Sequence, residues 1–441
     1  MTGASSESLP PITGVRLPNR PMDTLWDVTF SNGSSTNPTP HIDSIRQARS
    51  PAAVPSPPVV LPALVHPHVH LDKAFLYFSP EYADLIPTQG GFDEALSGTA
   101  RAKSRFTLPG LLRRGRMLLE ESVGYGVTAI RAFVEVDSTV RHLCLEAAIE
   151  LKQEWSGKCH LQVVCFAQDA VFSGPHGEEN RQLMIEAAKR PGVDVIGTTP
   201  YVEADGDAAR RNIEWAAETA LRLDKHLDFH LDYNLDVSKE PMIWHVIKTL
   251  KALSWPSKSH KCIMIGHATR LTLFSQHEWK KLAVDIQDAG LPIAFVGLPS
   301  SDVYMACAPG IGESQPRGTL SVCELVRRHG LNAVIGVNNV GNAFTPWGSC
   351  DPLALASLCV GIYQAGTQAD AQLLYECVSS RARVAMGLSS ASADVREGDA
   401  ADLLVVRGLR RGSGSPAEMV WDPSAARERE TVFEGRSISG D

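Results

Sequence analysis

The chain has 441 residues, of which 44% are hydrophobic and 21% are charged, and its net charge is −8. This length exceeds a usual single core and predicts either one large domain with an appendage or two domains. The negative charge argues against a nucleic-acid or anionic-membrane binder, and no segment approaches the roughly 18 apolar residues of a membrane span. The nine cysteines are dispersed without CxxC spacing, which is typical of reduced thiols inside a cell. Because the N-terminus lacks the features of a secretory signal, we expect a cytoplasmic protein.

The first 58 residues are rich in Pro, Ser, Thr and Asn and could not fold alone. Apolar patches stand at residues 12–17 and 25–30, and the second predicts a strand that enters a turn at Ser31-Asn32-Gly33. The segment from Ser44 to Pro58 is predicted to be an exposed loop.

From Val59 onward, short β-rich apolar runs alternate with amphipathic stretches of helical period. The predicted strands are residues 59–65, 127–134, 160–166, 193–197, 226–230, 262–267, 292–296 and 333–337. The predicted helices are residues 108–123, 141–154, 179–190, 208–223, 242–253, 276–289, 320–329, 352–365 and 369–386. Strict alternation of eight strands with helices predicts an α/β fold, a closed (β/α)8 TIM barrel. A doubly wound open sheet is the alternative, weakened because no GxGxxG follows the first strand.

From about Ser389 the pattern changes again. Residues 395–406 predict a turn followed by a strand, and residues 431–436 predict another short strand. These strands resemble the N-terminal ones in length and polarity, so we expect both ends of the chain to meet in a small β-sandwich domain. The predicted domains are residues 1–58 and 389–441, which form the two parts of that small domain, and residues 59–388, which form the barrel.

His66, His68 and His70 lie two residues apart at the end of the first predicted barrel strand. Side chains two apart on a strand share one face, and a parallel barrel builds its active site where its strands end. A lone histidine there is better interpreted as a core or turn residue. The repeated spacing instead favours a metal or substrate site, because two imidazoles at i and i+2 can hold one ion.

Polar residues also follow other predicted strands. At any one position a structural hydrogen-bonding role is the better interpretation, but several independent strand ends together predict a site. These residues are Gln168 and Asp169 after the third strand, His230 to Asn234 at the fifth, His267 at the sixth, and Asn338 and Asn339 at the eighth.

This set of histidines resembles the amidohydrolase superfamily, and most closely its cytosine deaminase branch, which includes N-isopropylammelide amidohydrolases. The resemblance covers nearly the whole chain from about Val59. The stretches that carry it are residues 68–74, 164–168, 228–232, 266–267, 336–348 and 398–405.

The resemblance implies that His68, His70 and His230 bind one divalent metal ion, Zn²⁺ or Fe²⁺. Three neutral imidazoles would leave such an ion open to water and would lower the pKa of that water. The resemblance also implies that His267 contacts water or substrate, and that Gln168 binds the edge of a pyrimidine-like substrate.

The departures from the family fall on the proton carriers. Where the family has an aspartate that binds the metal and takes up a proton, this chain has Asn338. Asn339 occupies the position of the next aspartate in the family pattern. Tyr233 replaces the glutamate that carries a proton in the family. On the second strand, Ala132-Phe133-Val134-Glu135 replaces the family pattern Thr-His-Val-Asp. Asparagine can ligate a metal but has no useful basicity, so metal affinity should fall. Tyrosine has a reference pKa of about 10 rather than about 4, and losing a positioned acid or base typically costs about 10²–10⁴ in rate.

Five further residues complete the predicted site. Asp232 is a substitute base, because it is two residues from His230 and should share its face. Lys73, Asp302, Asn339 and Trp347 are predicted to contact substrate.

Three functions remain open. The first is hydrolysis or deamination of a C–N bond in a cyclic nitrogen-containing small molecule, with His267 and either Tyr233 or Asp232 handling protons. The second is a repurposed barrel that catalyses isomerisation, cyclisation or elimination with little metal chemistry, where Asn338, Asn339 and Tyr233 orient the substrate. The third is a non-catalytic relative that binds a small molecule. The retained metal histidines favour the first function. The predicted partner is a small-molecule substrate, not nucleic acid or membrane, and a homo-oligomer stays open because barrels of this family commonly assemble.

Overall fold

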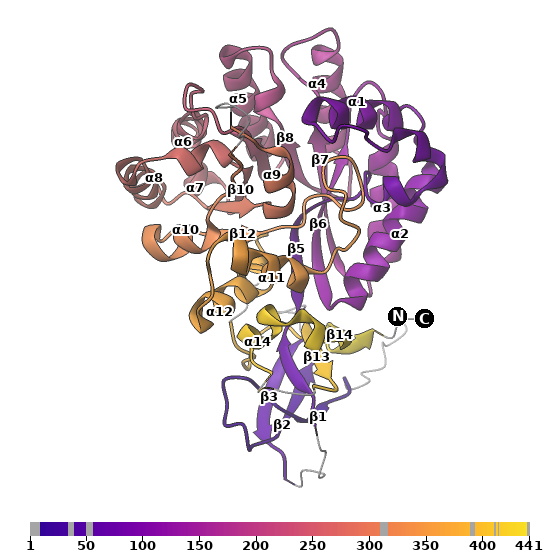
Figure 1. Ribbon diagram of the computed structural model, residues 1–441, viewed down its shortest axis with the longest axis vertical. Helices are drawn as coiled ribbons and strands as arrows, with labels where there is room; N and C mark the ends of the chain where they lie inside the picture. The colour runs from indigo at the N-terminus through magenta and orange to yellow at the C-terminus, as the bar shows by residue number, and fades with distance from the viewer. Residues whose placement is uncertain are drawn as a thin grey trace.

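The computed structural model describes residues 9–33, 39–49, 56–308, 316–388, 393–409, 412 and 414–438. Eight parallel strands form one sheet in the order β12-β11-β10-β9-β8-β7-β6-β5. The edge strands β5 and β12 meet at a parallel bridge between Val69 and Asn338, which closes the sheet on itself. The predicted (β/α)8 TIM barrel is therefore confirmed, and the open-sheet alternative is excluded (Figure 1).

The first barrel strand differs from the prediction. The apolar run over residues 59–65 divides at Ala63 into β4, which joins a small antiparallel sheet, and β5, which enters the barrel. The histidines at 66, 68 and 70 therefore lie within β5 rather than after it. The strands of the barrel are β5 (Leu64–His70), β6 (Val127–Glu135), β7 (His160–Ala167), β8 (Val193–Thr198), β9 (His226–Leu231), β10 (Ile263–His267), β11 (Ile293–Gly297) and β12 (Ala333–Ile335).

Helices cover the outside of the barrel (Figure 1). Several begin at a side chain that accepts a hydrogen bond from the first turn, as Thr107, Asp205 and Ser275 do, and this capping fixes where the helix starts. The helices between the barrel strands are α2 (Leu108–Gly124), α3 (Leu143–Glu154), α4 (Gly177–Ala188), α5 (Gly206–Arg222), α6 (Ile243–Ala252), α7 (Trp255–Lys258), α8 (Gln276–Asp288), α9 (Pro299–Met305) and α10 (Val322–His329).

The predicted helix over residues 369–386 is interrupted at Val378 and Ser379, so two helices stand there. The segment between β5 and α2 also contains a helix, α1 (Phe92–Lys103), that the sequence pattern did not predict. The last helices are α11 (Pro352–Ile362), α12 (Gln368–Cys377), α13 (Ser380–Ala385) and α14 (Pro416–Trp421), and the 3-10 helices are η1 (Leu76–Phe78), η2 (Pro80–Leu85), η3 (Pro200–Val202), η4 (Thr269–Leu273) and η5 (Pro423–Ala425).

The two ends of the chain form two small antiparallel sheets at one end of the molecule's long axis (Figure 1). One has the order β1-β2-β3 and the other the order β15-β14-β13-β4. They share an apolar cluster that includes Val28, Ile42, Val60, Leu403 and Val432. The strands are β1 (Ile12–Val15), β2 (Trp26–Ser31), β3 (His41–Gln47), β4 (Val59–Pro62), β13 (Leu403–Arg407), β14 (Glu428–Phe433) and β15 (Arg436–Ile438).

The loop predicted over residues 44–58 is wrong at its start, because residues 44–47 belong to β3, where they pair with β2. Residues 50–55 of that loop lie outside the described residues, as do residues 1–8 and 389–392 near the predicted domain ends. The domain boundaries at 58/59 and 388/389 stay predictions.

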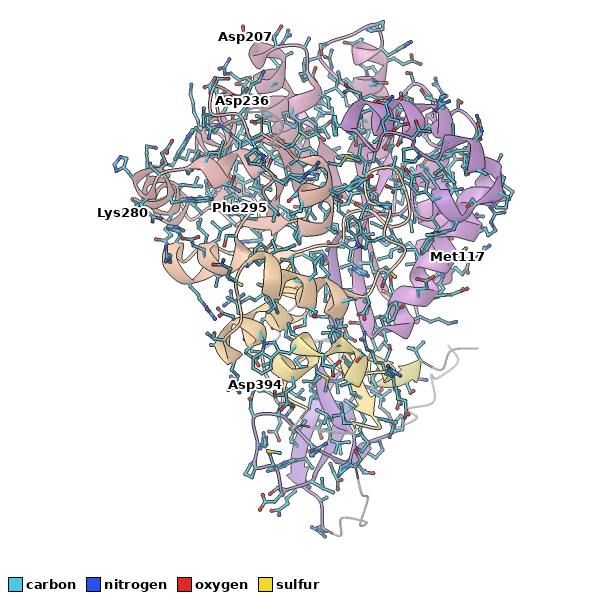
Figure 2. The ribbon with its side chains drawn as sticks, in the orientation of Figure 1. Met117, Asp207, Asp236, Lys280, Phe295 and Asp394 are labelled. Atoms are coloured by element: carbon cyan, nitrogen blue, oxygen red, sulfur yellow. The ribbon has the colours of Figure 1, made fainter. Side chains whose placement is uncertain are left out.

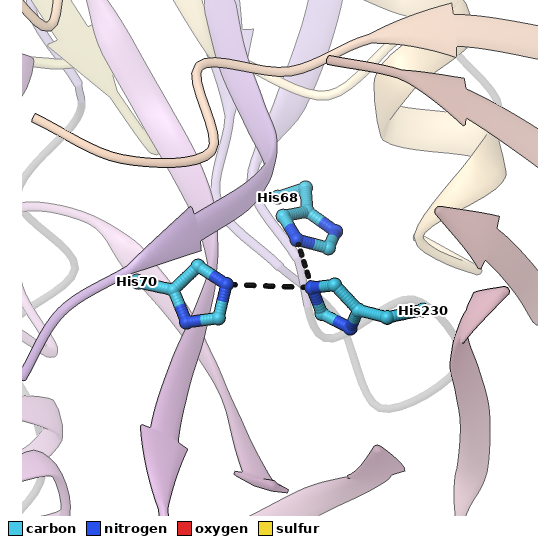
Figure 3. A group of neighbouring side chains, drawn as sticks. All are labelled: His68, His70 and His230. Carbon is cyan, nitrogen blue, oxygen red and sulfur yellow. Dashed lines mark hydrogen bonds between the residues drawn. The ribbon is translucent and has the colours of Figure 1, made fainter. Parts of the chain in front are cut away.

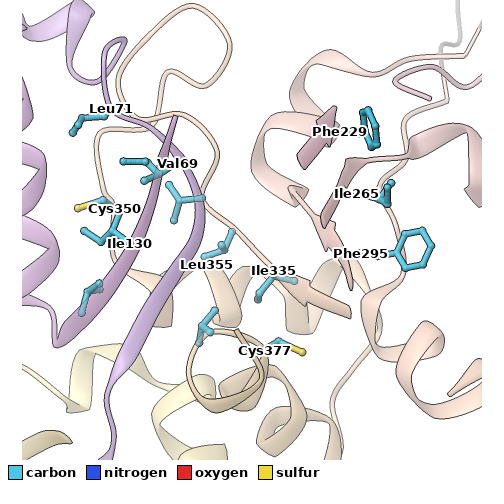
Figure 4. Close-up of a cluster of buried hydrophobic side chains, with 14 of the residues drawn as sticks. Val69, Leu71, Ile130, Phe229, Ile265, Phe295, Ile335, Cys350, Leu355 and Cys377 are labelled. Atoms are coloured by element: carbon cyan, nitrogen blue, oxygen red, sulfur yellow. The ribbon is translucent and has the colours of Figure 1, made fainter. Parts of the chain in front are cut away.

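The main core lies between the barrel strands and the helices. Its fully buried side chains include Val69, Ile130, Ile265 and Ile335 (Figure 4). Phe295 lies inside this layer, whereas charged side chains such as Lys280 stand at the periphery (Figure 2). None of the helices in the described part of the chain has the length and apolar character that crossing a membrane requires.

Candidate active site

Three histidines converge at the carboxyl end of the barrel. The Nε2 atom of His230 lies 2.9 Å from Nε2 of His68 and 3.3 Å from Nε2 of His70 (Figure 3). Strand alternation places His68 and His70 on the inner face of β5, and His230 comes from β9 on the other side of the barrel. All three side chains are buried. The fold thus brings together the three residues predicted as metal ligands.

The donor set of this cluster fits a divalent metal ion. Burial lowers the pKa of all three imidazoles well below the usual histidine range, and the charge of Lys73 lowers it further. The rings are therefore neutral at pH 7, as metal ligands must be. Their ligand atoms all lie within 4.8 Å of one another. Convergent neutral imidazole nitrogens are the donors that Zn²⁺ and Fe²⁺ accept.

Asn338 stands beside this cluster, directly after β12. Its backbone N–H donates to the carbonyl of His68 at 3.0 Å, and its carbonyl accepts from the N–H of His70 at 2.8 Å. The Asn338 side chain contacts the His68 ring and acts to raise its pKa, against the larger lowering by burial. The Oδ1 atom of Asn338 is buried beside the histidines. The amide oxygen therefore lies where it can also contact a ligand in the site.

Three strand ends around the site share a strained backbone. Asp232 after β9, His267 at the end of β10 and Asn338 after β12 have φ values of 50°, 62° and 66°. Non-glycine residues are uncommon in this left-handed region, where such strain often marks a functional site.

His267 is held by a buried carboxylate. Its Nδ1 donates to Oδ1 of Asp302 on α9 at 2.8 Å, and its ring centroid lies 5.1 Å from that of His230. The other oxygen of Asp302 accepts from the hydroxyl of Thr319 at 2.7 Å and from the N–H of Leu298 at 3.3 Å. With its proton on Nδ1, His267 presents a lone pair at Nε2. Asp302 therefore orients His267, and its predicted contact with substrate stays a prediction.

Tyr233 packs on the other side of His267, with ring centroids 4.0 Å apart. Tyr201 lies 5.7 Å from Tyr233, and Phe92 of α1 lies 6.0 Å from it, so aromatic rings surround this position. Burial raises the pKa of Tyr233 well above its usual range, so its hydroxyl is protonated at pH 7. The predicted substrate residue Gln168 interacts with Tyr201 in the same region.

Asp232 does not share the face of His230, and that expectation is wrong. Its two carboxylate oxygens accept hydrogen bonds from the N–H groups of Met242 at 2.8 Å and Ile243 at 3.1 Å, at the start of α6. The left-handed turn at Asp232 ends the strand, so the alternation expected from its spacing no longer applies. Burial raises its pKa to about 7, but its oxygens are already engaged as acceptors.

Lys73 joins a buried chain of charges next to the histidines. Its Nζ lies 2.6 Å from Oε1 of Glu135, whose Oε2 lies 2.6 Å from Nζ of Lys103 on α1. Lys103 also lies 2.5 Å from Asp137. Burial opposes ionisation of Glu135, but Lys103 and Lys73 outweigh it and hold its pKa below the usual range. This network fixes Lys73 and ties the end of α1 to the barrel.

Asn339 and Trp347 lie on neighbouring pockets. Oδ1 of Asn339 accepts from Nδ2 of Asn342 at 2.9 Å, and Asn339 lines a pocket of about 190 Å³ together with Trp347. Trp347 is 50% exposed and also lines a pocket of about 490 Å³ with Tyr304 and Arg317. The histidines are not among the residues that line either pocket.

Two residues that shape the site carry no functional motif in the sequence. Thr319 has nothing that marks it as a partner of Asp302, and Phe166 looks like an ordinary core residue of a strand although it packs against the ring of His230. Phe133, which stands where the family pattern has a histidine, stacks on the ring of His68. The inward-facing positions on β6 and β7 give both phenyl rings these contacts.

No protein-family model matches the chain. The chain is 23% identical to the N-isopropylammelide isopropyl amidohydrolase of Pseudomonas sp. (strain ADP) over 353 aligned residues. The alignment covers 80% of each protein. The structure resembles that of 5-methylcytosine deaminase from Klebsiella pneumoniae with bound 5-fluorocytosine, with a TM-score of 0.81, 21% identity and 98% of each chain covered. It also resembles N-isopropylammelide isopropylaminohydrolase from Burkholderia multivorans, with a TM-score of 0.72, 20% identity and 97% of each chain covered.

The fold and the site define a (β/α)8 barrel protein with a candidate metal centre of three histidines at its carboxyl end. The sequence relative, which is named as an amidohydrolase, extends over most of the chain, and the solved structures share the fold. These similarities agree with the resemblance of the sequence to the amidohydrolase superfamily.

Proposed function

We propose that the protein is a hydrolase that cleaves a non-peptide C–N bond, by hydrolysis or deamination, in a cyclic nitrogen-containing small molecule. The observation that carries this proposal is the convergence of three neutral imidazoles at the carboxyl end of the barrel, with His267 and Asp302 beside them. The similarity to proteins named as a 5-methylcytosine deaminase and as N-isopropylammelide hydrolases supports this substrate class.

His68, His70 and His230 would hold one divalent ion, for which Zn²⁺ and Fe²⁺ are the candidates. Such an ion acts as a Lewis acid and lowers the pKa of water in its open position. Because the histidines and Asn338 contribute no negative charge, we expect weaker binding of the ion than at a site closed by a carboxylate.

The active site that we propose is divergent, because its proton carrier is His267 rather than a carboxylate on the last strand. The hydrogen bond to Asp302 keeps the Nδ1 proton in place, so Nε2 of His267 can accept a proton in the site. Asn338 can offer only its amide oxygen. Tyr233, whose hydroxyl stays protonated, can donate a hydrogen bond to the substrate but cannot serve as a base at pH 7.

A second function is favoured by one observation. Three carboxylates around the site are engaged: Asp232 with backbone amides, Asp302 with His267 and Glu135 with two lysines. Carboxylates held in this way suit a reaction in which the substrate is polarised and oriented, such as isomerisation, cyclisation or elimination.

The test combines metal analysis with a substrate panel. The purified protein is analysed for metal by mass spectrometry and assayed against cyclic amidines, amides and lactams, with released ammonia or amine as the readout. We expect about one divalent ion per chain and release of nitrogen from at least one substrate. A folded protein that is metal-free and binds no added Zn²⁺ contradicts the hydrolase. Conversion of a substrate without release of nitrogen supports the second function.

A further inference from the structure

Two phenyl rings form a floor beneath the histidine cluster. Phe133 of β6 stacks on the ring of His68, with centroids 4.0 Å apart and an interplanar angle of 30°. Phe166 of β7 lies 4.4 Å from the ring of His230 and 5.3 Å from that of His70. The two phenyl rings meet edge to face at 5.3 Å, and both are fully buried. Each ligand ring therefore rests on an aromatic neighbour.

Glycines on the surrounding strands make room for this stack. A Cβ atom at Gly197 of β8 would lie 2.9 Å from the ring of Phe166, and one at Gly266 of β10 would lie 3.3 Å from Cε1 of His68. A Cβ atom at Gly336, just after β12, would lie 3.1 Å from Cβ of His68. Glycine within a strand often marks a close approach of other groups. The rings are thus clamped between the floor and the strand backbones.

Few polar contacts hold the histidine rings on the side that faces away from the cluster. The Nδ1 atoms of His70 and His230 are buried and have no partner in the part of the chain that the structure describes, and the His68 ring is contacted by the side chain of Asn338. In most metal sites such a ring nitrogen donates to a carboxylate or a carbonyl, which fixes the orientation of the ring. Ring packing must therefore contribute to the orientation of these histidines.

We propose that Phe133 and Phe166 are positioning residues that set the orientation of the metal ligands by ring packing. This inference rests on the proposed function for the presence of the ion, but the ring packing itself does not depend on it. Two buried phenyl rings restrict rotation of the imidazoles about their side-chain bonds. They also exclude water from the inner side of the site. The three Nε2 atoms are then aimed at one point before any ion arrives.

The test replaces the flat ring but keeps most of the apolar volume. Phe133→Leu removes the stacking surface under His68, and Phe166→Leu does the same under His230. Phe295→Leu is the matched control, because Phe295 is as deeply buried but packs in the outer core, away from the histidines. The Zn²⁺ dissociation constant is measured by competition with a chromophoric chelator. Histidine ring tautomers are measured by long-range ¹H–¹⁵N NMR on the metal-free protein.

We expect Zn²⁺ affinity to fall by about 10-fold or more in either floor variant and to stay within about twofold in the Phe295→Leu control. In the metal-free floor variants, the ring above the substitution should show mixed tautomers or exchange broadening. If Phe133→Leu does not fold, Phe166→Leu provides the same comparison.

Unchanged Zn²⁺ affinity and unchanged ring signals in both floor variants would overturn the proposal. That outcome leaves the proposed function intact, since the parent protein still binds Zn²⁺. If the parent protein binds no Zn²⁺, the proposed function fails instead. The NMR comparison on metal-free protein then still decides whether the phenyl rings orient the histidines.

Discussion

Replacing Asp302 with asparagine tests whether this carboxylate controls His267. Asp302 accepts hydrogen bonds from Nδ1 of His267, from the Thr319 hydroxyl and from the Leu298 N–H. An asparagine keeps one acceptor oxygen and turns an amide donor toward one of these donors. His267 then loses the negative charge that holds its proton on Nδ1, and the tautomer with a free lone pair at Nε2 is no longer enforced.

The size of the effect follows from the kind of bond that is lost. A hydrogen bond to a charged group contributes about 1.5–3 kcal/mol, which converts to a decrease in kcat/KM of about 10-fold to 10²-fold. Thr319→Val is the matched control, because it removes a hydroxyl donor but leaves the carboxylate charged and bonded to His267. The proton of His267 should then stay on Nδ1, and kcat/KM should fall less than in Asp302→Asn.

The assay measures kcat/KM on the substrate that the panel identifies, with the metal content of each variant determined in parallel. Neither residue is a proposed metal ligand, so the metal content should stay at the level of the parent protein. Asp302 does not control His267 if Asp302→Asn keeps kcat/KM within twofold and the NMR signals of His267 still report a proton on Nδ1.

Three further predictions concern the charges of the site and the core. Asn338→Asp adds a negative charge beside neutral ligands and should raise Zn²⁺ affinity on the order of 10-fold in chelator competition; an unchanged constant would place residue 338 outside the metal centre. Glu135→Gln removes the buried partner of two lysines and should lower the free energy of unfolding by about 3–5 kcal/mol in urea denaturation, whereas Glu154→Gln at an exposed pair should cost less than about 1 kcal/mol. Equal losses would contradict this assignment. Burial lowers the pKa of His226 to about 3, so below pH 6.5 the unfolded chain binds a proton that the folded chain does not, and stability falls by about 2 kcal/mol by pH 5. His226→Asn keeps an acceptor for the Cys262 N–H and should reduce the loss of stability between pH 7 and pH 5 by about 2 kcal/mol, while the other buried histidines keep their part of it. A profile as steep as that of the parent protein would show that His226 does not contribute.

The barrel was predictable because its signal is local and repeated. Apolar runs and helical periods alternate along the chain, and each run needs only its neighbours to be recognised. The histidines were predictable for the same reason, since strand spacing fixes the direction of His68 and His70. The division between β4 and β5 was not predictable, because the apolar run continues through it. Only the pairing changes, from β13 for β4 to β6 for β5.

The supporting residues of the site could not be predicted, since their role exists only in three dimensions. Asp302 and Thr319 stand at separate places in the sequence and meet only because the segment around Thr319 lies against α9. Asp232 shows the opposite error: its spacing suggested a side chain beside His230, but a left-handed turn directs its oxygens to α6. Phe133 stands where the family pattern has a histidine, and in the structure it is a buried core residue. Its contact with His68 depends on which face of β6 points inward.

The seam of the barrel limits which residues can stand at position 338. The main chain of Asn338 joins the first and last strands, so the join does not depend on the side chain. The φ value of 66° there excludes β-branched and bulky residues, while glycine, asparagine and aspartate tolerate it. Asparagine and aspartate have nearly the same shape and differ by one unit of charge. A single amino-acid replacement can therefore change the electrostatics of this pocket without opening the barrel, which makes position 338 an accessible point for the divergence of activity within this fold.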